Sequence, residues 1–175
     1  LAAADPANLR HRADVAAAHG RLGIICRELN DDAAGLDHAR KARAIYETLA
    51  AADPANLRHR YALVTQLLDE ALLLKESDYA AAKQAYAKAR EHSASLLKAN
   101  DKEFDHRRNF VVIGLNESNL HLYHRTLPAA REAIAAAAEA NAAMQKNFPD
   151  SSRVKRDAER IANTQRDIEA AERAP

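Results

Sequence analysis

The stretch LAAADPANLRHR occurs twice in this chain, at residues 1–12 and again at residues 49–60. A degenerate third version, LKANDKEFDHRR, begins at Leu97. One aspartate in each version keeps the same register, 48 residues apart: Asp5, Asp53 and Asp101. Self-similarity at a fixed period of this length predicts a solenoid, in which one supersecondary unit is repeated along the chain.

The composition indicates an all-helical protein. The 175 residues are 47% hydrophobic, mostly through alanine, and 29% charged, with four glycines and no tryptophan. Abundant Ala, Glu, Lys and Arg favour helices, and the small side chains allow helices to approach closely. Because aromatic residues make up only 5% of the chain, we expect many thin helix–helix seams rather than one large core. The length suits a single domain.

Charge and cysteine content exclude some function classes. The 26 basic and 25 acidic residues leave a net charge of +1, whereas a nucleic-acid binder normally carries a strong basic excess. The single cysteine, Cys26, excludes an internal disulfide framework, and we interpret it as a buried, inert thiol. There is no apolar run of membrane-spanning length and no signal peptide. We expect a cytoplasmic location, or an extracytoplasmic one if a membrane-spanning segment lies upstream in a parent protein.

Each period divides into two helices. Asp5 and Asp53 are predicted to cap the first helix of a pair, with Pro6 and Pro54 at its first position. Turn signals at residues 30–32, 77–78 and 125–128 separate the two helices of each pair. The expected repeats cover residues 6–53, 54–101 and 102–149, and a charged capping helix covers residues 150–175.

Apolar residues recur at helical spacing in every predicted helix. In the first helix the stripe that we expect to be buried consists of Val15, Ala18, Leu22, Ile25 and Leu29. The stripes of later helices are centred on Tyr46, Leu68, Tyr86, Ile113, Ile134 and Ile161.

The spacing of small and large residues resembles the tetratricopeptide repeat (TPR). In that family a Leu-Gly pair in the first helix is followed by a small, a bulky and a small residue in the second. The matching residues are Leu22-Gly23 with Gly35, Ala39 and Ala42, then Ala82, Tyr86 and Ala89, then Ala130, Ile134 and Ala137. The period of 48 is longer than the family's usual period of about 34 residues. Later periods replace the Leu-Gly pair by Glu70-Ala71 and Ser118-Asn119.

The resemblance implies a right-handed α-α superhelix, a solenoid of about three helix pairs plus a C-terminal capping helix. Residues 1–175 would then form one TPR-like domain. The LAAADPAN phrase resembles repeats of bacterial multidomain proteins, some of them serine/threonine kinases with the repeats C-terminal to the kinase domain. Because the first four residues match the end of a helix at residues 49–52, we expect a piece of a longer protein that lacks the preceding helix.

In this family the first helices of the pairs line a concave groove that binds a peptide or a partner domain. The groove positions carried over by register are Arg21, Ile24, Arg27, Thr65, Leu68, Asp69, Leu72, Asn116, Glu117, Leu120 and Tyr123. Gly20 and Ile24 replace two residues of the clamp with which some relatives hold a C-terminal carboxylate. A chaperone-tail binder is therefore disfavoured.

The leading hypothesis is a non-catalytic scaffold module that binds a protein partner within a bacterial signalling protein. No Gly-rich phosphate loop or hydrolase motif occurs in the chain, and we expect no cofactor. One alternative is a structural spacer, or a segment that associates with itself through its truncated ends. A third is a metal-dependent helical enzyme built on Glu117, His121 and His124, which share one helical face. Since no fourth ligand is evident, we expect no metal.

Basic residues recur once per period, and two interpretations stay open for them. They are Arg10-His11-Arg12, Arg58-His59-Arg60, His106-Arg107-Arg108 and Arg153 with Lys155 and Arg156. Stacked repeats would align them along one edge as a track for anions or acidic peptides. Alternatively, the arginines form ion pairs with acidic side chains of neighbouring helices, such as Glu28 or Glu47.

Overall fold

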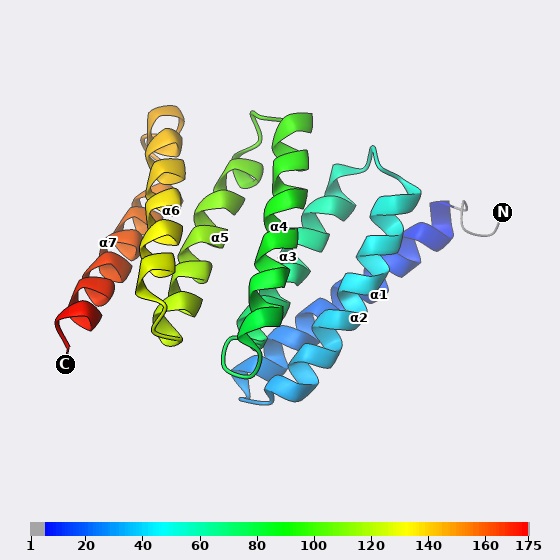
Figure 1. The fold of residues 1–175 in the computed structure, drawn as a ribbon. Helices are drawn as coiled ribbons and strands as arrows, with labels where there is room; N and C mark the ends of the chain where they lie inside the picture. Colours follow the sequence, from blue (N-terminus) through cyan, green and yellow to red (C-terminus); the bar gives the residue numbers. More distant parts are fainter. Residues whose placement is uncertain (1–5, 175) are drawn as a thin grey trace. The chain divides into compact units, whose positions relative to one another are not determined.

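The computed structural model describes residues 6–174, which form seven α-helices and contain no β-strand (Figure 1). The helices are α1 (Pro6–Glu28), α2 (Asp32–Ala52), α3 (Leu57–Leu73), α4 (Tyr79–Ala99), α5 (Phe104–Tyr123), α6 (Leu127–Asn147) and α7 (Ser152–Arg173). The all-helical class predicted from the composition is confirmed.

The chain divides into two compact units, Leu1–Leu96 and Leu97–Pro175. The N-terminal unit contains α1, α2, α3 and most of α4, and the C-terminal unit contains α5, α6 and α7. Each unit has its own buried residues, so the packing of each is described separately below.

Short polar side chains begin the second helix of two pairs and the last helix. The Asp31 carboxylate accepts a hydrogen bond from the Ala34 amide (3.1 Å) at the start of α2. Asp78 does the same for the Ala81 amide (2.9 Å) at the start of α4. Ser151 accepts from the Val154 amide (3.4 Å) at the start of α7. These caps satisfy amides that have no partner within the helix, and the turns predicted at residues 30–32 and 77–78 are confirmed.

The predicted role of the second Asp-Pro pair is wrong. The Asp53 amide donates to the Leu49 carbonyl (3.0 Å) and so ends α2, and α3 begins only at Leu57. The Asn56 amide donates to the Asp53 carbonyl (3.1 Å) across the turn that contains Pro54. Because Asp53 closes the preceding helix, it does not cap the following one. In the first copy α1 begins at Pro6, whereas Asp5 lies outside the described residues.

The N-terminal unit is held together by close helix contacts at small residues. α1 and α2 are adjacent in Figure 1 and cross where Gly23 meets Gly35. A Cβ atom on Gly23 would lie 3.2 Å from the Gly35 carbonyl oxygen. Ala16 and Ala39 are buried on either side of this seam. Small side chains therefore bring the two backbones together, as expected of glycine and alanine at these positions.

The stripe expected to be buried on α1 is instead exposed. Val15, Leu22, Ile25 and Leu29 are 51%, 43%, 49% and 73% exposed, and Ala18 is exposed as well. The helix packs through Ala16, Gly20 and Gly23 on its opposite face, because these small residues allow the closest approach. Cys26, expected to be buried, is half-buried.

The stripes predicted for the other helices of this unit are confirmed. Tyr46 and Leu49 of α2, Val64 and Ala71 of α3, and Tyr86 of α4 are all buried. Helix α3 is buried over most of its circumference because α1, α2 and α4 all pack around it.

The C-terminal unit has a core formed by all three of its helices. Its largest buried members are Val111, Leu115, Ile134, Met144, Val154, Ile161 and Ile168. α5 and α6 approach most closely at Gly114, where a Cβ atom would lie 2.8 Å from the Ala133 carbonyl oxygen. The rings of Phe104 and Phe148 pack edge to face at 5.0 Å and cover one side of this core. The stripes predicted around Ile134 of α6 and Ile161 of α7 are thus confirmed.

Candidate protein-interaction site

The groove positions predicted in the N-terminal unit meet between α1 and α3. Arg27 of α1 and Asp69 of α3 form an ion pair, with Nη1 4.0 Å from Oδ1. Leu68 is buried, Leu72 is half-buried and Ile24 is exposed. We call these five residues the α1–α3 site.

Asp69 is the residue of this site whose pKa departs from its ordinary value. Its side chain is 18% exposed, and its Oδ2 atom is buried without a hydrogen-bond partner among the described residues. Burial raises the pKa of Asp69 to about 6, and the nearby Arg27 guanidinium opposes the increase only in part. A carboxylate with an unused buried oxygen is a strong acceptor for an N–H group from a ligand.

The two remaining predicted residues of this unit contribute less. Arg21 is exposed on α1. The Thr65 hydroxyl donates to the Tyr61 carbonyl (3.3 Å) of its own helix, so its proton is already used.

In the C-terminal unit the predicted positions lie on α5 and differ widely in exposure. Leu120 is 1% exposed and belongs to the interior, so it is not available to a ligand. Asn116 and Glu117 are half-buried. Tyr123 is 48% exposed, and its ring packs edge to face on His124 at 5.1 Å. Tyr123 is therefore the residue of this set that a partner would meet first.

The residues of the metal hypothesis do not form a ligand group. Within residues 6–174, no three His, Cys, Asp or Glu side chains lie close enough to hold a metal ion. His121 is buried, with its Nδ1 atom 3.1 Å from the Thr126 hydroxyl. That hydroxyl in turn donates to the His121 carbonyl (3.1 Å) at the end of α5. This local arrangement fixes the turn into α6.

A pocket of about 300 Å³ opens between α2, α3 and α4 of the N-terminal unit. Its charged lining residues are Arg40, Arg43, Glu70 and Lys88. The buried Glu70 carboxylate lies 3.4 Å from Arg40 Nε and 2.8 Å from Arg43 Nε. Both arginines are thus engaged in neutralising Glu70, which explains how α3 tolerates a charged residue at a buried position.

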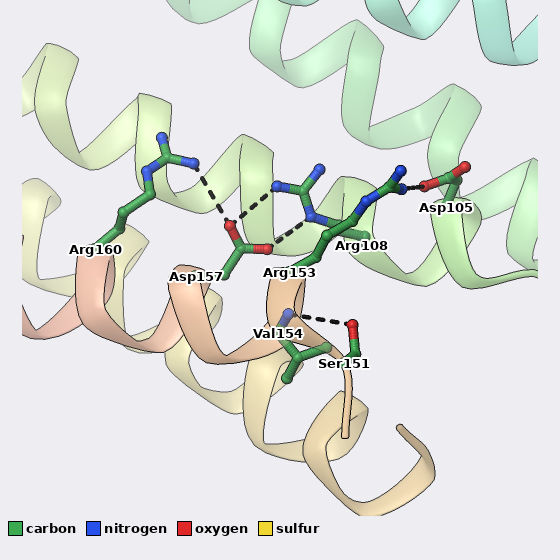
Figure 2. A network of polar contacts seen from close by, with 7 residues as sticks. All are labelled: Asp105, Arg108, Ser151, Arg153, Val154, Asp157 and Arg160. Carbon is green, nitrogen blue, oxygen red and sulfur yellow. Dashed lines mark hydrogen bonds and ion pairs between the residues drawn. The ribbon is translucent and has the colours of Figure 1, made fainter. Parts of the chain in front are cut away.

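Several of the periodic basic residues form ion pairs, with partners that the sequence reasoning did not name. Arg108 donates two hydrogen bonds to Asp157 of α7, from Nε (2.7 Å) and Nη2 (3.0 Å), as Figure 2 shows. The Asp157 side chain is only 1% exposed and also meets Arg160 at 3.5 Å. Beside it, Arg153 pairs with Asp105 at 3.3 Å (Figure 2).

Glu47 was expected to pair with one of the periodic basic residues, and this prediction is wrong. Glu47 instead pairs with Arg43 of its own helix (3.0 Å). Asp157 could have been suspected from the sequence, since it lies 49 residues after Arg108, about one period further along. Arg107 remains near its own turn, where it pairs with Asp101 (3.8 Å).

No helix of the described residues is both long enough and apolar enough to cross a membrane. No protein-family model matches this chain, and neither a curated protein nor a solved structure was found to match it. The functional assignment therefore depends on the chain's own surfaces.

Proposed function

We propose that this chain is a non-catalytic protein-interaction module, a long-period TPR-like array of right-handed superhelical form. The 48-residue period and the glycine-lined α1–α2 seam support this assignment. The proposed context is a scaffold within a larger bacterial signalling protein, as the resemblance of the LAAADPAN phrase suggests.

The observation that carries the proposal is the unsatisfied carboxylate of Asp69 in the α1–α3 site. Its buried Oδ2 atom lacks a hydrogen-bond partner among the described residues, and the same site includes the apolar side chains of Ile24, which is exposed, and Leu72, which is half-buried. A peptide that presents a backbone N–H or a basic side chain to Asp69, and an apolar residue to Ile24, fits this combination.

Binding is expected to depend on pH through Asp69. The pKa of this carboxyl is raised to about 6, so the ionised form, which accepts hydrogen bonds only, predominates above that pH. Affinity for a basic peptide is therefore highest at neutral pH and falls as the pH decreases below 6.

Selection of peptides from a display library on the full chain tests the site, followed by calorimetric titration of a selected peptide. We expect Asp69→Asn to weaken binding by about tenfold, because it removes a charge-assisted hydrogen bond. Asp167→Asn, an exposed aspartate on α7, is the matched control and leaves the affinity unchanged. Equal affinity of the wild-type chain and Asp69→Asn would place the binding elsewhere.

A second candidate function is self-association, and one specific observation favours it. The exposed apolar residues of α1 form a continuous stripe that has no cover within the described residues. This stripe lies on the face opposite Gly20 and Gly23 and is separate from the α1–α3 site.

A further inference from the structure

The outer face of α1 has the spacing of a helix–helix seam. Its members recur at alternating intervals of three and four residues, the a and d pattern of a coiled coil. We call this set the outer stripe: Val15, Ala18, Leu22, Ile25 and Leu29. Three of its large apolar side chains, Val15, Leu22 and Ile25, lie on α1, and Leu29 lies in the turn directly after it. No other helix of the described residues exposes more than one large apolar side chain.

The internal repeat identifies this face as one that packs against another helix. A shift of one period places Leu22 on Glu70 and Ile25 on Leu73 of α3. In α3 these positions are buried against α2, where Glu70 meets Arg40 and Arg43. The Leu73 side chain lies within 3.0 Å of where a Cβ atom on Gly35 would be. The face that α2 covers in α3 is thus open in α1 among residues 6–174.

The charges beside the outer stripe indicate what covers it. Arg21 and Glu28 lie seven residues apart, along the same side of the stripe, and both are exposed. Among residues 6–174, neither Arg21 nor Glu28 forms an ion pair. They occupy equivalent flanking positions, which meet one another across an antiparallel pair of helices.

We propose that α1 docks antiparallel on α1 of a second copy of this chain. Placing Leu22 opposite Ile25 of the second copy also places Ala18 opposite Leu29, so that a small residue faces a large one. In this register Arg21 faces Glu28 of the second copy, and the two-fold symmetry repeats the attraction. A parallel pair, or an antiparallel one centred on Gly20, lacks this complementarity.

The interface goes beyond the α1–α3 site, since it uses the opposite face of α1. A contact of one helix face per copy is small among specific interfaces. We therefore expect a reversible dimer with a dissociation constant in the micromolar range.

Sedimentation equilibrium of the full chain, from low micromolar to near-millimolar concentrations, tests the proposal. The wild-type chain is expected to convert from monomer to dimer across this range. Leu22→Lys should remain monomeric, because the substitution places a charge at the centre of the stripe. Ala87→Lys, an exposed position on α4, is the matched control and leaves the association unchanged. Circular dichroism verifies that both variants retain their helices.

Charge reversal tests the orientation. Arg21→Glu and Glu28→Arg should each weaken the dimer by about tenfold, since each creates two like-charge contacts. The double variant should restore the wild-type association, and Lys146→Glu on α6 serves as the control for a change in net charge. A chain that stays monomeric at every concentration overturns the proposal, as does a dimer insensitive to Leu22→Lys. Failure of the double variant to restore association overturns the antiparallel register.

Discussion

Asp69 shows how burial alone changes the chemistry of a single side chain. The nearest guanidinium, that of Arg27, lies 4.0 Å away, which is too far for a hydrogen bond. The attraction is therefore weaker than the cost of removing the carboxylate from water, and the pKa increases to about 6. The cost of burying this carboxylate is therefore not fully offset in the folded chain, and a hydrogen bond from a ligand would reduce it.

The stability of the chain should depend on pH through this residue. Between the ordinary value of 3.8 and the folded value of about 6, the folded state retains a proton that the unfolded state has lost. The free energy of unfolding therefore decreases as the pH increases through this window. The difference corresponds to roughly 3 kcal/mol at most. Asp69→Asn should remove the penalty and increase stability at pH 7, as measured by urea unfolding at pH 4.5 and pH 7. A variant less stable than the wild type at pH 7 would contradict this prediction.

The Arg108–Asp157 pair is the opposite case, because its hydrogen bonds offset the free-energy cost of burying the Asp157 carboxylate. Two short hydrogen bonds reach a carboxylate that is 1% exposed, so removal of the charge leaves Arg108 without its partner. We expect Asp157→Asn to cost about 2–4 kcal/mol of unfolding free energy. Asp105→Asn, which breaks the more exposed pair with Arg153, should cost less than about 1 kcal/mol. Equal losses of unfolding free energy for the two variants in urea titrations would show that the buried pair stabilises the chain no more than the exposed one.

At the scale of the helix pair, glycines set how closely two helices approach. A Cβ atom at Gly114 would meet the Ala133 carbonyl oxygen at 2.8 Å and Ala137 Cβ at 2.9 Å. Neither neighbour can move without shifting α6. At Gly20 the added atom would meet only the end of the flexible Gln66 side chain, at 3.0 Å.

Gly114→Ala should therefore destabilise the chain by roughly 1–3 kcal/mol, even though alanine is the better helix former. Gly20→Ala should be neutral or stabilising by up to about 1 kcal/mol, because Gln66 can rotate away. Thermal unfolding of the two variants compares them directly. A stable Gly114→Ala chain would mean that the α5–α6 contact is looser than described.

Helical periodicity predicted the elements well, and the buried face of most of them. The stripes around Tyr46, Tyr86 and Ile134 are buried as expected, because each of these helices carries its large apolar residues on the side that faces a neighbour. Periodicity failed for α1, where small residues form the contact and large ones lie outside. A stripe indicates that a face is apolar, but it does not say which neighbour covers it.

The candidate site was only partly predictable for a related reason. Of the residues selected by the register between repeats, Arg27 of α1 and Asp69 of α3 form an ion pair. The register also selected Leu120, which is buried, because side chains equivalent by register need not have equivalent neighbours. The role of Asp157 was missed, since the sequence does not show which acid a repeated arginine meets.

At the scale of the whole molecule, the chain divides into two compact units, Leu1–Leu96 and Leu97–Pro175. Cooperative units of this kind open independently when each buries its own apolar residues. We expect Gly114→Ala to accelerate amide hydrogen exchange in α5, α6 and α7, while α2 and α3 keep the protection of the wild type. Hydrogen exchange followed by mass spectrometry resolves the two sets of helices. An equal loss of protection in both units would show that they unfold as one.

The Arg108–Asp157 pair also bears on how such a chain can change its length during evolution. An arginine occupies the same register in every period, at Arg12, Arg60 and Arg108, whereas the matching acid occurs once, in α7. Gain or loss of a whole period before α7 therefore still leaves an arginine one period upstream of Asp157. The terminal helix α7 can in this respect follow a different number of periods, because the arginine that Asp157 needs recurs at the same register in each of them.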